Sequence, residues 1–73
     1  MREKLRPGPT GLLTEREQEV LAELPSMRTA AEIADDLFVS TNTVKTHMRS
    51  IYRKLGVPHR RAAVVEARCQ GLL

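Results

Sequence analysis

Two helical patterns lie almost end to end in the middle of this chain. Thr29 stands three residues before Glu32, the spacing of a capping box in which each side chain satisfies the other's free backbone N–H. Ser40, a good N-cap, follows the first pattern after only two intervening residues. Apolar residues recur at helical spacing in both patterns, namely Ile33, Ala34 and Leu37, then Val44, Met48, Ile51 and Leu55. This order of short helix, tight turn and longer helix is typical of a helix-turn-helix unit.

A further helix is predicted on each side of this unit. Thr14 and Glu17 repeat the capping-box spacing, and Pro25 ends that helix because a residue before proline is pushed out of the helical region. Gly56 and Pro58 end the long helix, and small apolar residues at helical spacing follow. The sequence therefore predicts an all-α, four-helix bundle that contains a helix-turn-helix, with helices at about 14–24, 29–37, 41–55 and 60–70.

The length of 73 residues allows one small domain. Aromatic residues make up only 3% of the chain, so the core must be aliphatic, which favours packed helices. Residues 1–12 include Arg-Pro-Gly-Pro-Thr-Gly and are predicted to be a flexible linker, and residues 13–73 the domain. We expect the chain to be the C-terminal piece of a longer protein.

Several function classes have no support in the sequence. No run approaches the roughly 20 apolar residues of a membrane span, which predicts a soluble, cytoplasmic protein with no membrane partner. Cys69 with His47 and His59 falls short of a zinc pattern. No nucleophile–base pair or phosphate loop is present. We therefore expect no enzyme, no cofactor, no metal and no small-molecule ligand in this domain.

Charge is divided unevenly along the chain. Between residues 14 and 36 the acids outnumber the bases, and they are Glu15, Glu17, Glu19, Glu23, Glu32, Asp35 and Asp36. Between residues 37 and 65 there is no acid, and the bases are Lys45, Arg49, Arg53, Lys54, Arg60 and Arg61. An ordinary solvated helix face usually mixes the two signs, so the second half favours a polyanionic partner.

The helix predicted at 41–55 has a polar face opposite its apolar stripe when it is viewed at about 100° per residue. That face carries Asn42, Lys45, Thr46, Arg49 and Arg53. Lys and Arg match guanine acceptors, Asn matches adenine, and a Thr methyl can touch the thymine methyl. The flank carries Thr43, His47 and Lys54, where phosphates would run, and the free N–H groups near Ser40 and Thr41 can hold a phosphate. The pattern predicts binding to double-stranded DNA.

Other residues leave two interpretations open. Arg60 and Arg61 fit loop solubility or phosphate contact equally well, and His59 either caps the last helix or belongs to the loop. Tyr52 is expected to pack at the edge of the core. An outer stripe on the last helix is either incidental or a surface for helix pairing, and consists of Ala62, Val65, Cys69 and Leu72. A free Cys on that stripe is exposed if the stripe faces outward, although free Cys is usually buried.

Four strings carry a family resemblance. They are Leu-Thr-Glu-Arg-Glu-Gln-Glu-Val-Leu at 13–21, Ala-Glu-Ile-Ala-Asp-Asp-Leu-Phe-Val-Ser at 31–40, Thr-Val-Lys-Thr-His at 43–47 and Ile-Tyr-Arg-Lys-Leu-Gly-Val at 51–57. Over residues 13–73 the chain resembles the LuxR-type (GerE-type) DNA-binding domain, and it looks most like the C-terminal domains of MalT-like activators. It departs from the family where residues 24–27 lack the usual Gly and where His59 replaces the usual Ser or Asn.

The resemblance implies a transcription regulator whose third helix reads the major groove. Base contacts then come from Asn42, Lys45, Thr46 and Arg49, and phosphate contacts from Thr43, Arg53 and Lys54. The fourth helix, with the stripe named above, would pair two copies as a homodimer on a two-fold-related site, and RNA polymerase is a further candidate partner. The rival hypothesis is a basic helical interaction module that binds an acidic protein partner, which salt-dependent titration against duplex DNA would separate from DNA binding.

Overall fold

The computed structural model describes residues 13–73, so the linker predicted at 1–12 lies outside the described residues. The helices are α1 (Glu15–Glu23), α2 (Ala30–Leu37), α3 (Thr41–Leu55) and α4 (Arg60–Cys69), and no strand occurs among the described residues. The predicted all-α architecture is confirmed. Each helix end lies within one residue of the prediction. Helices α1 and α2 begin one residue later than predicted, because their N-cap threonines stand just outside the helical backbone.

The predicted capping boxes begin both α1 and α2. The Thr14 hydroxyl accepts from the Glu17 N–H at 3.1 Å, and the Thr14 N–H donates to the Glu17 carboxylate at 3.0 Å. Thr29 and Glu32 make the same pair of bonds at 3.2 and 2.8 Å. Each box satisfies two of the backbone N–H groups that a helix start leaves free, which is why both starts could be located from the sequence.

Two left-handed residues end α2 and α3. Gly56 has φ 71°, which glycine adopts freely, whereas Phe38 has φ 59° and keeps its ring 93% exposed. A non-glycine residue in this region costs about 1–2 kcal/mol. The Val39 N–H donates back to the Ala34 carbonyl at 3.0 Å, and this bond closes the turn from α2 into α3.

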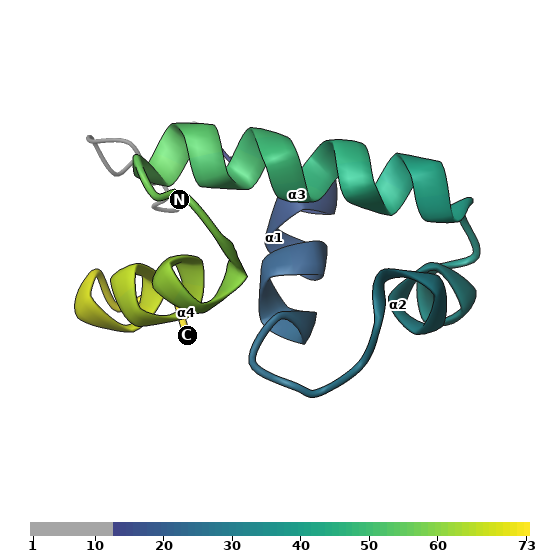
Figure 1. Ribbon diagram of the computed structural model, residues 1–73, viewed down its shortest axis with the longest axis horizontal. Helices are drawn as coiled ribbons and strands as arrows, with labels where there is room; N and C mark the ends of the chain where they lie inside the picture. The colour runs from purple at the N-terminus through teal and green to yellow at the C-terminus, as the bar shows by residue number, and fades with distance from the viewer. Residues whose placement is uncertain (1–12) are drawn as a thin grey trace, which may run out of the picture.

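Helix α3 is the centre of the fold. It runs across the top of Figure 1, with α4, α1 and α2 beneath it, and it contacts all three. The buried apolar residues are Leu13, Val20, Leu21, Leu24, Ile33, Ala34, Val44, Ile51, Leu55, Ala63 and Ala67. Met48 and Tyr52 are half-buried against this core, as the sequence predicted for Tyr52. Because one side of α3 is held by the core, its other side has a defined direction.

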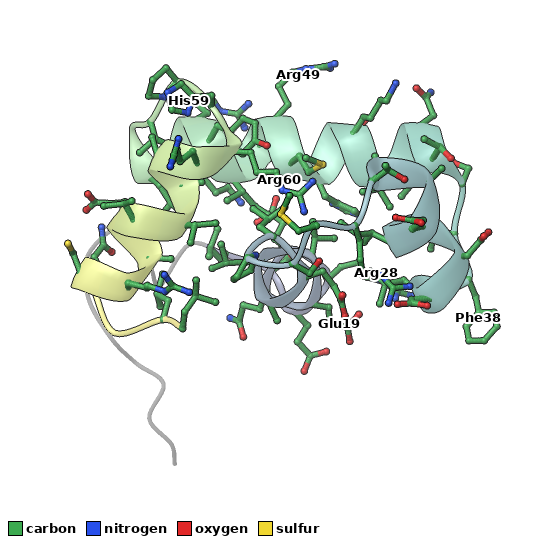
Figure 2. All side chains as sticks on the ribbon, turned by 60° about the horizontal axis from the view of Figure 1, so that its bottom comes forward. Glu19, Arg28, Phe38, Arg49, His59 and Arg60 are labelled. Atoms are coloured by element: carbon green, nitrogen blue, oxygen red, sulfur yellow. The ribbon has the colours of Figure 1, made fainter. Side chains whose placement is uncertain are left out.

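The loop between α1 and α2 is held from α4. The Arg60 guanidinium donates to the Leu24 carbonyl at 3.0 Å and to the Ser26 carbonyl at 2.9 Å, and Figure 2 shows Arg60 directed toward this part of the molecule. The Ser26 hydroxyl also donates to the Glu23 carbonyl at 2.7 Å. Arg60 thus has a structural role that differs from both interpretations offered by the sequence. No residue of this loop has a positive φ, so its backbone does not require a glycine.

Candidate nucleic-acid interface

The outer face of α3 is the candidate interface. The residues predicted to lie opposite the apolar stripe are all exposed, and they are Asn42, Lys45, Thr46, Arg49 and Arg53. Figure 2 shows Arg49 pointing away from the other helices. No carboxylate occurs on α3 itself, so nothing on this helix offsets the charge of the face. The face therefore presents cationic and amide donors outward from a helix whose opposite side is buried.

The start of α3 is shaped by Ser40. Its hydroxyl accepts from the Thr43 N–H at 3.0 Å and lies 2.9 Å from the Thr43 hydroxyl. Ser40 is exposed, whereas Thr41, Thr43 and His47 are half-buried. The cap leaves other N–H groups of the first turn without an intrahelical partner, and the positive end of the helix dipole points the same way.

A buried carboxylate ties α1 to the far end of α3. Glu17 is only 5% exposed, and its two oxygens accept from the Lys54 ammonium at 2.8 Å and from the Ser50 hydroxyl at 2.7 Å. Lys54 was predicted as a phosphate contact on the flank, and the structure places its ammonium in a salt bridge with Glu17. The lysine is therefore part of the packing between α1 and α3.

The pKa of Glu17 reflects this cluster. Burial by itself raises the pKa of the carboxyl, because it disfavours the charged form. The donors Lys54, Thr14 and Ser50, together with the charge of Lys54, outweigh burial and lower the pKa from 4.5 to about 2. Glu17 is therefore a carboxylate at neutral pH, and it holds Lys54 as its counter-ion.

Sequence reasoning missed Ser50 and the second role of Glu17. Glu17 was recognised only as a capping residue, although it stands three, four and seven residues before core positions Val20, Leu21 and Leu24. An acid on an apolar helix stripe is a signal that a partner must be supplied from elsewhere. Ser50 and Lys54 are four residues apart, so they share a face of α3 and can reach one carboxylate.

Helix α4 begins at a histidine cap and exposes part of its predicted pairing stripe. The His59 imidazole Nδ1 accepts from the Ala62 N–H at 3.1 Å, so His59 is the N-cap of α4 and not plain loop. On the predicted pairing stripe, Val65 is 57% exposed and Cys69 is exposed with a free thiol. Ala62 and Leu72 are half-buried, and Leu72 packs against the core. The accessible part of the stripe is therefore centred on Val65 and Cys69.

Two further kinds of site are absent from the described residues. Within residues 13–73, no group of three or more His, Cys, Asp or Glu side chains could hold a metal ion. No helix in this part of the chain is long and apolar enough to cross a membrane. Tyr52 is half-buried against the core, and this burial raises the pKa of its hydroxyl, while the charge of Arg60 partly offsets that rise.

Comparison with known proteins identifies the family. Residues 11–67 match the family described as bacterial regulatory proteins, luxR family. The structure of the response regulator ChrA of a heme-sensing two-component system is similar, with a TM-score of 0.80 and 43% sequence identity over 96% of this chain. The chain spans about a third of the ChrA chain, since it covers 33% of it.

These matches confirm the resemblance to LuxR-type domains and agree with the expectation that the domain is not an enzyme, because the family consists of DNA-binding regulators. ChrA is a response regulator, so the similarity to it gives no particular support to the finer likeness to MalT-like activators. The chain belongs to the luxR family of bacterial regulatory proteins and is a helix-turn-helix DNA-binding domain of a transcription regulator.

Proposed function

We propose that α3 lies in the major groove of double-stranded DNA and reads its sequence with Asn42, Lys45, Thr46 and Arg49. The observation that carries this proposal is that all four are exposed on one face without a carboxylate, while the opposite face of α3 is buried in the core. Lys45 and Arg49 lie one helical turn apart and match the guanine acceptors O6 and N7. Asn42 matches adenine, and the Thr46 methyl suits the thymine methyl.

A second set of residues would hold the DNA backbone. Arg53 is exposed at the far end of the same face, while Ser40, Thr41 and Thr43 surround the start of α3, where a phosphate meets free N–H groups and the helix dipole. His47 is half-buried beside them. Lys54 also belongs to the predicted phosphate contacts, but its salt bridge with Glu17 neutralises part of its charge. We therefore expect Lys54 to contribute less to the salt dependence of binding than Arg53 does.

Pairing through α4 is the second element of the proposal. Two copies would meet through the stripe of Ala62, Val65, Cys69 and Leu72, centred on the exposed Val65 and Cys69. This is far less surface than the roughly 1,200–2,000 Å² of a stable interface, so pairing should depend on DNA that carries two related half-sites.

The larger protein is inferred from the family and from ChrA. We propose that this domain is the DNA-binding output of a response-regulator-like transcription regulator, with the likeness to MalT-like activators as the alternative. The cytoplasmic location and the contact with RNA polymerase stay predictions. The rival function, a basic module that binds an acidic protein through α3, would show no preference among DNA duplexes.

Selection of bound duplexes from a random pool tests the proposal. We expect a two-fold-related consensus, and affinity for the selected duplex should fall linearly with salt on logarithmic axes. Val65→Glu should abolish paired binding and leave single half-site binding intact, because Val65 is exposed and its loss opens no core cavity. Equal binding to selected and scrambled duplexes would favour the rival function, and cooperative binding by Val65→Glu would contradict pairing through α4.

A further inference from the structure

A groove of about 740 Å³ lies between the α1–α2 loop and α4. Buried Leu24 and half-buried Val64 line it. Met27, which is 96% exposed, and Val65, which is 57% exposed, are the accessible apolar side chains of its lining. The groove therefore offers two accessible apolar side chains beside its buried and half-buried lining.

The charge of the groove has one sign. Arg61 and Arg68 line it together with Arg60, and no carboxylate lines it. On α4, Arg61 precedes Val65 by four residues and Arg68 follows it by three, so the two arginines flank Val65 on the helix surface. Both are exposed, and neither forms a salt bridge with any residue of the described chain.

The third arginine joins the two walls of the groove. Arg60 donates to the carbonyls of Leu24 and Ser26, so it joins the loop wall of the groove to the α4 wall. These bonds hold the two walls together in the structure, and a groove that is formed before binding lowers the entropic cost of binding. The guanidinium of Arg60 is engaged in these bonds, so Arg61 and Arg68 are the cations available to a partner.

We propose that this groove binds a short acidic segment of a partner protein, which places an apolar side chain between Met27 and Val65 and carboxylates on Arg61 and Arg68. The planar guanidinium matches a carboxylate with two parallel hydrogen bonds. Met adapts its shape and is common at surfaces that accept varied partners. The inference goes beyond DNA binding, because none of these residues belongs to the proposed DNA-contacting face.

Other occupants fit the groove less well. A second copy of the chain would bring the same two arginines and no carboxylate from its own groove, so the charges would repel. A DNA backbone offers phosphates for the arginines but no apolar side chain for Met27 and Val65. The proposed pairing stripe shares Val65 with the groove, so a second copy and the acidic segment would compete for this side chain, whereas Ala62, Cys69 and Leu72 do not line the groove.

The test is an NMR titration of the ¹⁵N-labelled 73-residue chain with a peptide in which two leucines are flanked by aspartates. We expect saturable shifts of the backbone signals at Met27, Arg61, Val65 and Arg68. Two matched peptides, one with glycine for leucine and one with lysine for aspartate, should bind at least about tenfold more weakly. Thermal unfolding checks that each variant is folded.

Variants separate the groove from general electrostatics. The double variant Arg61→Glu with Arg68→Glu should bind the aspartate peptide at least about tenfold more weakly and gain affinity for the lysine peptide. Met27→Ser should also weaken binding of the aspartate peptide. It should not destabilise the fold, because this side chain is exposed. The matched control is Lys45→Glu with Arg49→Glu, which changes the net charge equally and should alter peptide affinity by no more than about twofold.

Several outcomes would overturn the inference. One is the absence of saturable binding of the aspartate peptide, and another is a set of shifts centred on α3. Equal losses of peptide affinity in the groove variant and in its control would show that net charge alone explains the binding. Sedimentation that shows the chain paired in the absence of DNA, with Met27→Ser disrupting the pair, would assign the groove to a second copy. Displacement of the peptide by a DNA duplex in the Lys45→Glu, Arg49→Glu variant would assign it to DNA.

Discussion

Lys45 and Lys54 are lysines on the same helix with opposite surroundings. Lys45 lies on the outer face of α3 and is exposed, whereas the Lys54 side chain is 21% exposed and its ammonium lies 2.8 Å from the Glu17 carboxylate. The same division separates Arg49, which points outward, from Arg60, which is bonded to loop carbonyls. A stretch of sequence that carries only positive charge thus contains one group of cations that is exposed on the outer face and another that is bonded within the domain.

The difference teaches that charge in a sequence identifies a surface only after the internal partners are known. A cation that faces a buried carboxylate or a row of carbonyls contributes mainly to stability, whereas an exposed one costs the fold nothing when it is removed. The two groups should therefore respond differently to pH and to substitution.

Acid should produce the largest effect on stability, because it protonates Glu17, the buried partner of Lys54. The pKa of Glu17 is about 2 in the folded chain against 4.5 for an unperturbed group, so its contribution is fully present above about pH 4.5 and is lost as the pH falls toward 2. The shift corresponds to about 3 kcal/mol of the free energy of unfolding. Urea unfolding between these pH values should show this loss in the natural chain and much less of it in Glu17→Gln. An identical pH slope in both proteins would contradict the assignment.

Truncation of the outer group should affect DNA binding alone. Lys45→Ala and Arg49→Ala should each cost about 1–3 kcal/mol at the preferred duplex and relax base discrimination there. Their free energies of unfolding should change by less than about 0.5 kcal/mol, because both side chains are exposed. Titration against a selected and a scrambled duplex measures both properties. If the two duplexes lose affinity equally, α3 holds the backbone and does not read the bases.

Lys54→Ala should lower stability by about 1–2 kcal/mol, because the Glu17 carboxylate then stays buried without its counter-ion. The loss is smaller than for a fully buried pair, since Lys54 keeps some exposure. The matched control is Lys45→Ala on the same helix. Equal stability of the two variants, measured by chemical denaturation, would erase the distinction between the two groups of cations.

Arg60→Ala should have the smallest effect, about 1 kcal/mol of stability, because water can replace part of the two hydrogen bonds to Leu24 and Ser26. The neighbouring Arg61→Ala is the control and should change stability by less than about 0.5 kcal/mol, because Arg61 is exposed. Hydrogen exchange should report faster opening at Ser26 and Met27 in Arg60→Ala only. Unchanged exchange there would show that the loop does not depend on α4.

Local signals explain what could be predicted about the fold. The capping boxes at Thr14 and Thr29, the N-cap Ser40 and the C-cap Gly56 are interactions among residues close in the chain, so their spacing marks the helix ends directly. The exposed face of α3 followed for the same reason, because helical periodicity separates the residues opposite Val44 and Ile51 from the core side.

Non-local contacts account for what could not be predicted. Ser50 and Lys54 meet Glu17 across more than thirty residues, and Arg60 reaches the Leu24 carbonyl across 36. Nothing in the spacing along one helix indicates which residue of another helix will face it. The groove between the α1–α2 loop and α4 also depends on this packing, and its lining has no pattern in the sequence.

The sequence by itself determined the four helices, the helix-turn-helix order, the outward face of α3 and, through its motifs, the luxR family. Each of these depends on interactions within about one or two helical turns or on short sequence motifs, and the order of residues along the chain indicates both. Only the tertiary structure decided which cations are internal and which are free, that Leu72 turns to the core, and where the groove lies. The physical reason is that pairing and burial depend on which helix surfaces meet, and that is set by packing all of the helices around one core.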